Sequence, residues 1–244
     1  MNIALIGYGR MGKEVERQAQ DRGHAITAVF DVGDQFCSES NCHGADVLIS
    51  FVTADVVIPN LTSIAKMGLP VVEGTTGWFD SLETAKKIPD LTMIYSANFS
   101  VGVYQFIRLV GLAAEMMGSL PEYDCCIHEF HHRGKVDSPS GTAKQLARVI
   151  LENLAHKEYP LYDTSHGMID QKALHVTSTR FGRVPGTHQV GFDSPADEIV
   201  LSHVAHGREG FALGAVRAAE WLIGRRGIFS MDDLMNDILN IKSV

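Results

Sequence analysis

The sequence predicts an α/β protein built from an N-terminal doubly wound parallel sheet and a second, α+β part with an open mixed sheet. Residues 1–100 alternate short apolar strands with amphipathic helices, which is typical of the β–α units of a parallel sheet. After about residue 120, longer β-patterned stretches replace this alternation. Two helical segments end the chain, and we expect them to rejoin the first part. The predicted domains are therefore 1–100 with 209–244, and 101–208.

The first strand, 3–7, leads directly into a glycine-rich turn. The turn is followed by a helix that should end at Gly23, and then by a strand, 25–30, that stops at Asp31, nineteen residues after Gly12. A Gly-x-Gly-x-x-Gly motif in this context indicates a Rossmann-type dinucleotide site. Its glycines allow a tight turn, close approach to a pyrophosphate and close helix–strand packing, and Asp31 would bind the adenine-side ribose. The motif consists of Gly7, Tyr8, Gly9, Arg10, Met11 and Gly12.

Further strands are predicted at 47–52, 69–72 and 91–95, with helices at 57–67, 80–88 and 103–117. Two loops follow the carboxyl ends of strands, where open α/β sheets bind ligands. We expect these loops to line a crevice near a nicotinamide through Gly74, Thr75, Thr76, Ala97, Asn98 and Phe99.

The densest group of chemically active side chains lies in residues 129–143, between a predicted strand, 123–130, and a predicted helix, 141–154. Pro139 cannot lie inside that helix, so Ser140 is the expected N-cap. The free N–H groups of the first turn, at Gly141 and Thr142, would bind a substrate carboxylate. Just upstream, donors of adjustable pKa are available from His131, His132 and Lys135. A charged surface loop that only caps a helix is the alternative.

The second domain should continue with strands at 173–183, 189–192 and 198–206, whose open sheet could pair between subunits. The final helices are predicted at 211–223 and 230–239. Ser230 and Asp233 resemble a capping box at the start of the last helix.

Composition excludes several classes of protein. The chain has 244 residues, 45% of them hydrophobic and 20% charged, as in ordinary globular proteins. A net charge of −8 argues against a general nucleic-acid partner. No apolar run reaches the roughly 18 residues of a membrane span, and we expect no signal peptide. The four cysteines have neither metal-knuckle spacing nor the density of a disulfide framework, which favours a reduced, cytoplasmic location.

Four motifs occur together in one order: the glycine turn 7–12, Glu-Gly-Thr-Thr-Gly at 73–77, Ala-Asn-Phe-Ser-Val-Gly at 97–102, and the block 129–142. With these motifs the chain resembles, over essentially its whole length, the 4-hydroxy-tetrahydrodipicolinate (dihydrodipicolinate) reductases. The resemblance implies NAD(P)H-dependent reduction of a cyclic dicarboxylate, with loss of its 4-hydroxyl, in the diaminopimelate route to lysine. It also implies a homotetramer assembled through the second domain.

The resemblance implies roles for individual residues. His131 would be the proton donor and acceptor, and Lys135 a proton donor. A substrate carboxylate would be bound by His132, Gly141 and Thr142. Chemistry agrees, because hydride delivered to ring C4 leaves negative charge developing toward the ring nitrogen, which a cationic donor stabilises. Arg208, in the turn 206–210, would lie near the interdomain crevice, where its planar donors suit a carboxylate or phosphate; an ordinary solvated turn residue is the alternative.

Two positions depart from the family pattern. Thr187 precedes His188 where relatives commonly have Glu, which leaves the role of His188 open. Val32 follows Asp31 where several relatives have an arginine that meets a 2′-phosphate. An acid without that arginine should repel the phosphate, so we predict that NADH is preferred, with some use of NADPH because Arg10 is close in sequence.

Three other readings compete with this one. A metal could bind Glu129, His128, His131 and His132, but the spacing is not His-Glu-x-x-His and a nearby lysine opposes a cation, so we predict no metal. Another Rossmann-type dehydrogenase, such as a homoserine or inositol dehydrogenase relative, would lack the block 129–142. A non-catalytic dinucleotide sensor would bind the cofactor without turnover and would leave that block unexplained.

Overall fold

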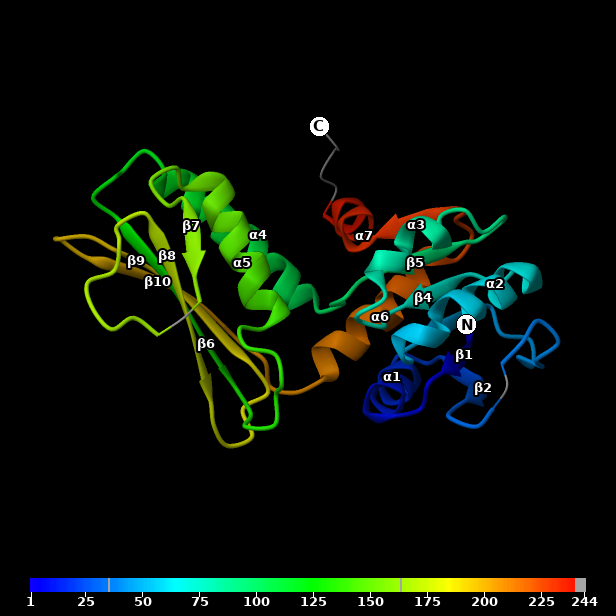
Figure 1. The fold of residues 1–244 in the computed structure, drawn as a ribbon. Helices are drawn as coiled ribbons and strands as arrows, with labels where there is room; N and C mark the ends of the chain where they lie inside the picture. Colours follow the sequence, from blue (N-terminus) through cyan, green and yellow to red (C-terminus); the bar gives the residue numbers. More distant parts are fainter. Residues whose placement is uncertain (35, 163, 240–244) are drawn as a thin grey trace. The chain divides into compact units, whose positions relative to one another are not determined.

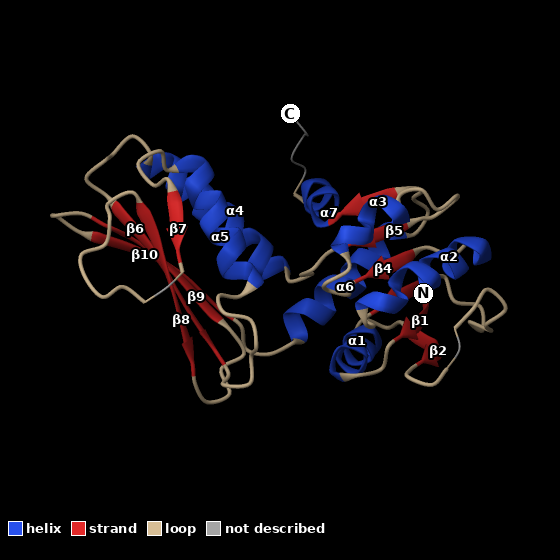
Figure 2. Cartoon of the chain, in the orientation of Figure 1, coloured by secondary structure: helices blue, strands red, loops and turns tan. Residues whose placement is uncertain are grey.

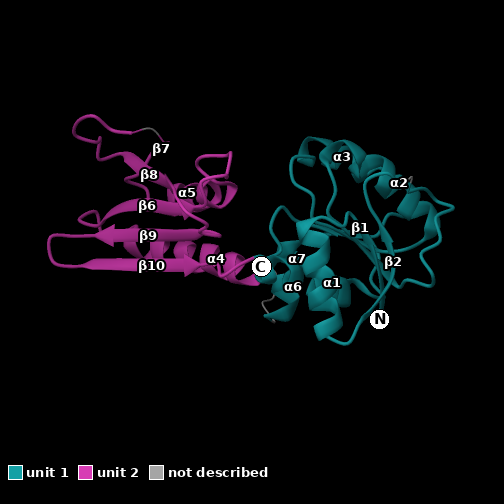
Figure 3. Ribbon diagram, turned by 90° about the horizontal axis from the view of Figure 1, so that it is seen from below, with its two compact units in different colours: residues 1–100, 208–244 teal, residues 101–207 magenta. Residues whose placement is uncertain are grey.

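The computed structural model describes residues 1–34, 36–162 and 164–239. It divides into two compact units (Figure 3): unit 1 comprises Met1–Ser100 together with Arg208 and the residues after it, and unit 2 comprises Val101–Gly207. The sequence-based boundary placed Arg208 in the second domain. Arg208 instead belongs to unit 1, because it is the N-cap of helix α6 (Glu209–Leu222), whose buried face packs within unit 1.

Unit 1 contains a six-stranded sheet in the order β11-β5-β4-β3-β1-β2, and every adjacent pair is parallel. The predicted parallel sheet is therefore confirmed (Figure 1). Strand β11 was not predicted, because three residues are too short to show a pattern. The strands are β1 (Asn2–Ile6), β2 (Ala25–Phe30), β3 (Val47–Ser50), β4 (Val71–Glu73), β5 (Met93–Tyr95) and β11 (Ile228–Ser230).

Helices cover both faces of this sheet (Figure 1, Figure 2). Helices α1 and α6 pack against each other over one face, and α2 and α3 lie over the other. Strands β1, β3, β4 and β5 are buried on both faces, which explains why they read as continuous apolar runs, whereas the edge strands β2 and β11 are more exposed. These helices are α1 (Arg10–Asp21), α2 (Val57–Met67), α3 (Leu82–Ala85), α6 and α7 (Met231–Ile238), with short 3-10 turns at Ala54–Val56 and Phe79–Ser81.

The strand order places a topological switch beside β1. The chain runs from β1 to β2 on one side and then crosses to β3 on the other side of β1. At such a point the loops after neighbouring strands diverge, and a crevice opens at their carboxyl ends. The fold of unit 1 therefore fixes where a ligand can bind.

Unit 2 contains a mixed five-stranded sheet in the order β10-β9-β6-β8-β7. Strands β6, β7 and β8 run parallel to one another, whereas β9 is antiparallel to both β6 and β10. Helices α4 and α5 pack together over one face of the sheet (Figure 1). The elements are α4 (Val101–Met117), β6 (Asp124–His131), α5 (Gly141–Asn153), β7 (Tyr159–Leu161), β8 (Ala173–Arg180), β9 (Thr187–Asp193) and β10 (Glu198–Val204).

The predicted N-cap of α5 is confirmed. Ser140 is the N-cap of α5, and its side chain accepts a hydrogen bond from the Ala143 N–H. Cys125 is buried and its neighbour Cys126 is exposed, as alternation along a strand requires. Strand β7 was missed, and β8 ends at Arg180 rather than at 183.

The last helix also begins as predicted, with a capping box between Ser230 and Asp233. No helix in the described part of the chain is long and apolar enough to cross a membrane.

Candidate active site

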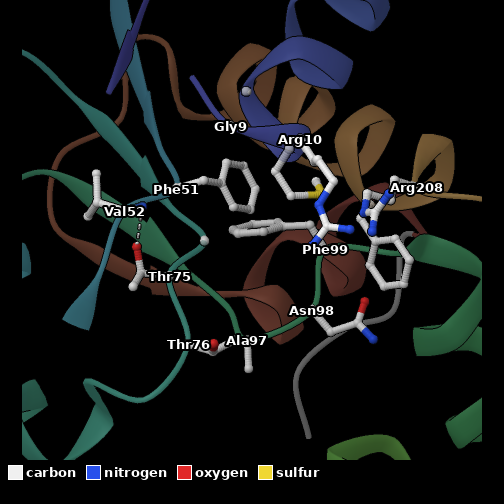
Figure 4. A pocket seen from close by; sticks show the side chains of 14 residues that line it. Gly9, Arg10, Phe51, Val52, Thr75, Thr76, Ala97, Asn98, Phe99 and Arg208 are labelled. Carbon is white, nitrogen blue, oxygen red and sulfur yellow. Dashed lines mark hydrogen bonds between the residues drawn. The ribbon is translucent and has the colours of Figure 1, made fainter. Parts of the chain in front are cut away.

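A pocket of about 400 Å³ opens in unit 1 at the topological switch (Figure 4). Its walls come from the loops that follow β1, β3, β4 and β5, together with the start of α6. The lining residues are Gly9, Arg10, Met11, Gly12, Phe51, Val52, Gly74, Thr75, Thr76, Ala97, Asn98, Phe99, Arg208 and Phe211.

The three glycines of the first loop occupy distinct environments. Gly7 has φ of +89°, and a Cβ there would lie 2.0 Å from the Phe51 carbonyl oxygen. A Cβ on Gly12 would lie 2.2 Å from the Gly7 carbonyl oxygen, so only glycine lets α1 approach β1 this closely. A Cβ on Gly9 would meet nothing within 4 Å among the described residues. Gly9 thus borders open space.

The start of α1 is suited to an anion. Its N-cap is Gly9, which has no side chain to cap the helix, and its first turn contains no acidic residue. The first N–H groups of a helix have no intrahelical partner, and the helix dipole favours negative charge beside them. A pyrophosphate fits this end of the pocket.

Asp31 lies at the edge of the same loop. Its Oδ1 accepts a hydrogen bond from the Tyr8 N–H at 3.1 Å. That bond is the main reason why the pKa of Asp31 lies below its ordinary value, and a second backbone bond, from Val32, adds to it. Asp31 is therefore an exposed, ionised acceptor beside the glycine loop.

A buried glutamate, Glu73, anchors the loop after β4. Glu73 is 0% exposed, and its Oε1 accepts a hydrogen bond from the Thr75 N–H at 2.8 Å. Burial raises the pKa of Glu73. The Thr75 hydroxyl in turn accepts from the Val52 N–H at 3.0 Å, which ties this loop to the one after β3 (Figure 4). The two loops therefore form one wall of the pocket.

The pocket includes most of the predicted cofactor residues, but not Gly7, Tyr8 or Asp31, which lie beside it. Arg208, which we predicted to bind substrate, also lines this pocket. Sequence reasoning missed Phe51, Val52 and Phe211. The first two directly follow β3, so the rule that ligands bind at carboxyl strand ends could have found them.

A second site lies in unit 2, around Glu129 on β6. This side chain is 0% exposed, and three donors converge on its Oε1: the Ser140 N–H at 2.9 Å, the Ser178 hydroxyl at 2.8 Å and Arg180 Nη2 at 2.7 Å. Burial alone would raise the pKa of this carboxyl. The polar side chains around it, first His188 and then Ser140 and Arg180, outweigh burial and hold its pKa well below the ordinary value. Glu129 is thus a buried carboxylate.

Two histidines face this carboxylate. His188 on β9 places its Nε2 3.3 Å from Glu129 Oε2, and His131 at the end of β6 places its Nδ1 3.4 Å from the same oxygen. Their rings meet edge to face, with centroids 5.2 Å apart. Burial lowers the pKa of His131 to about 4, against the attraction of the Glu129 carboxylate. His131 is therefore neutral at neutral pH in the free protein.

The remaining residues of the motif surround this network. Lys135 follows in a turn in which its N–H donates to the His132 carbonyl at 3.1 Å, and its ammonium group donates to Asp137 Oδ1 at 2.7 Å. Gly141 is exposed and Thr142 is half-buried at the start of α5. Sequence reasoning missed Ser178 and Arg180, which reach Glu129 from β8.

The ligand atoms of Glu129, His131 and His188 all lie within 4.8 Å of one another, a separation that could suit a metal ion. Arg180, however, donates to the same carboxylate at 2.7 Å, and its positive charge opposes a cation. The Ser140 hydroxyl also donates to Glu129 Oε2. The donors thus favour a hydrogen-bonded network over a metal centre.

Comparisons with known proteins agree with this architecture. The family described as "Dihydrodipicolinate reductase, N-terminus" matches residues 1–99, and "Dihydrodipicolinate reductase, C-terminus" matches residues 102–235. A 4-hydroxy-tetrahydrodipicolinate reductase from Christiangramia forsetii is 42% identical, over 98% of this chain and 99% of that protein. One from Archaeoglobus fulgidus is 37% identical, over 96% of this chain and 100% of that protein.

A solved structure has the same fold. It is a dipicolinate-bound dihydrodipicolinate reductase from Paenisporosarcina sp. TG-14, with a TM-score of 0.72 and 22% identity, covering 94% of this chain and 97% of that one. Two family models that together span almost the entire chain, and relatives that match it from end to end, lead to one conclusion: this chain belongs to the dihydrodipicolinate reductase family.

Proposed function

We propose that the chain reduces 4-hydroxy-2,3,4,5-tetrahydrodipicolinate to 2,3,4,5-tetrahydrodipicolinate, with NAD(P)H, in the diaminopimelate route to lysine. The curated relatives are named for this reduction. The observation that carries the proposal is the pair of sites in one chain. Unit 1 has a pocket suited to a dinucleotide, and unit 2 has a buried carboxylate network beneath His131 and the start of α5.

The pocket in unit 1 fits the proposed cofactor. The uncapped N-terminus of α1 and the open space at Gly9 suit a pyrophosphate, and Asp31 suits a ribose. The loops around Thr75 and Asn98 would hold the nicotinamide end. When bound, the nicotinamide supplies hydride to ring C4 of the substrate.

In unit 2, cationic and N–H donors would bind the two substrate carboxylates. The start of α5, at Gly141 and Thr142, offers N–H groups and a favourable dipole. Lys135 offers a positive charge, and it would exchange Asp137 for the substrate. Anionic substrate beside His131 would raise the pKa of that ring from about 4 toward neutrality. His131 and Lys135 would then donate the protons of the reaction.

Turnover tests the reaction and the site together. The substrate is generated from pyruvate and aspartate semialdehyde with the preceding synthase, and NADH oxidation is followed by absorbance. We expect wild-type turnover, and a kcat reduced by ~10²–10⁴-fold in Lys135→Ala and in His131→Ala, because a positioned proton donor contributes about that much.

Lys144→Ala is the matched control for these variants. It removes an exposed cation from α5 outside the Glu129 network and should leave kcat within about threefold of wild type. Absence of wild-type turnover despite tight NADH binding would contradict the proposed reaction and favour the sensor or another substrate.

We predict that substitutions at two glycines of the loop after β1 affect NADH binding and protein stability to different extents. Gly9→Ala should weaken NADH binding by about tenfold or more, because its methyl group would enter the space needed by the pyrophosphate, while the melting temperature falls less than in Gly12→Ala. Gly12→Ala should lower the melting temperature, because overpacking costs about 1–3 kcal/mol. Fluorescence titration with NADH and thermal melts measure the two effects. Equal NADH affinity in Gly9→Ala and wild type would place the pyrophosphate elsewhere.

Cofactor preference depends on Asp31. Its carboxylate should repel a 2′-phosphate, so we propose that NADH is preferred and that NADPH is used less well, with Arg10 supplying partial compensation. Asp31→Ser should raise kcat/KM for NADPH relative to NADH by about tenfold. Steady-state kinetics with both cofactors measures the ratio, and a wild-type enzyme that strongly favours NADPH would refute the proposal.

The proposed assembly is a homotetramer formed through unit 2. The edge strand β10 exposes Ile199, Val200 and Val204, which are 39%, 50% and 56% exposed, and an apolar strand edge is a natural pairing surface. Light scattering should give four times the chain mass of 26.7 kDa, and Val200→Lys should lower it. A monomeric wild-type mass would exclude this assembly.

The proposed enzyme acts in the cytoplasm on a small dicarboxylate, with no nucleic-acid or membrane partner.

A further inference from the structure

The hydrogen-bond donors around Glu129 determine where the proton of His188 lies. The Ser140 hydroxyl has one proton, and it donates that proton to Glu129 Oε2, since an ionised carboxylate can only accept. Its oxygen therefore accepts from its two other neighbours, the Ala143 N–H at 3.1 Å and His188 Nε2 at 3.1 Å. His188 must carry its proton on Nε2.

This assignment leaves one ring nitrogen beside Glu129 whose proton is not yet placed. Glu129 Oε2 accepts from the Ser140 hydroxyl, and the His188 Nε2 proton is directed to the oxygen of that hydroxyl. The remaining ring nitrogen that faces the same carboxylate oxygen is His131 Nδ1.

His131 turns one nitrogen toward that negative charge and the other away from it. Nδ1 lies 3.4 Å from Glu129 Oε2. Nε2, across the ring, lies against Gly186 in the loop between β8 and β9, where a Cβ would come within 3.0 Å of it. A lone pair on Nδ1 would face a buried carboxylate, whereas an N–H there would be attracted by it.

We propose that Glu129 is a positioning residue that holds His131 in the tautomer with its proton on Nδ1, so that Nε2 is the nitrogen that accepts and donates the proton. This inference rests on the proposed function, because it names the reacting atom of the same site. The protonated ring formed when Nε2 accepts a proton is stabilised by the same carboxylate. A buried carboxylate plays this part for the histidine of serine-protease triads.

Glu129→Gln tests the role with little change of shape. The amide oxygen can still accept from Ser178 and Arg180, but an NH₂ group replaces Oε2. That donor favours a lone pair on Nδ1 and shifts His131 to the Nε2–H tautomer. We expect kcat to fall by up to ~10⁴-fold, as when a triad carboxylate becomes an amide. KM should change much less than kcat, because the amide oxygen still accepts from the Ser140 N–H that holds the start of α5.

Lys144→Ala, on the exposed face of α5 and outside the Glu129 network, is the control, and its kcat should stay within about threefold of wild type. Thermal melts of both variants report any loss of fold. If Glu129→Gln lowers kcat but leaves the tautomer of His131 unchanged, Glu129 has only a structural role and the proposal is overturned.

The tautomer itself can be measured without turnover. Histidine ¹⁵N NMR spectra distinguish Nδ1–H from Nε2–H, and comparison with His131→Asn identifies the His131 signals. We expect Nδ1–H in the wild type at neutral pH and Nε2–H in Glu129→Gln. The Nε2–H tautomer in the wild type would refute the proposal even if Glu129→Gln fails to fold. An enzyme without reductase activity but with the Nδ1–H tautomer would refute only the function.

Discussion

The need to satisfy one buried carboxylate organises unit 2. Glu129 has no access to water, and an unpaired buried charge costs several kcal/mol. Its partners come from three segments distant in sequence: Ser140 at the start of α5, Ser178 and Arg180 at the end of β8, and His188 on β9. These contacts with Glu129 hold the N-terminus of α5 beside the end of β8 and the start of β9. The proposed carboxylate-binding turn at Gly141 is held in place by the same bonds.

In unit 1, glycines that let backbone segments pack closely position the loops of the pocket, rather than a buried charge. Gly7 and Gly12 allow β1, α1 and the loop after β3 to touch, and Gly74 allows the Phe51 ring to pack where a Cβ would lie 2.2 Å from it. These contacts bring four loops to one pocket at the switch point of the sheet. Gly9 is the exception that borders open space. Three glycines serve packing, and one leaves room for a ligand.

The parts predicted from sequence are those that depend on near neighbours. A glycine turn between strand and helix, the Ser140 cap and the Ser230 capping box each involve groups within a few residues, so short motifs identify them. Most residues of the pocket follow from one rule about strand ends. Strand β11 was missed because its place beside β5 is determined by packing rather than by a pattern of its own.

The network around Glu129 could not be predicted in the same way, because it depends on strand register. Ser178 on β8 and His188 on β9 both pair with Glu129, one on each side of β6. A one-residue shift of either strand would turn these side chains to the other face. Motif spacing indicated that His131 was chemically important, but not which carboxylate lay behind it. The domain boundary at Arg208 differs by one residue for a related reason: the place of Arg208 in unit 1 follows from the packing of α6.

The register of β9 also shows how the threonine at position 187 affects His188. Thr187 stands where relatives commonly have an acid, and this made the role of His188 uncertain. Successive residues on a strand point to opposite faces, and Thr187 pairs with Phe130 whereas His188 pairs with Glu129. Thr187 is half-buried on the face away from the network, and His188 is 4% exposed within it. A change at Thr187 therefore leaves the contacts of His188 with Glu129 and Ser140 intact.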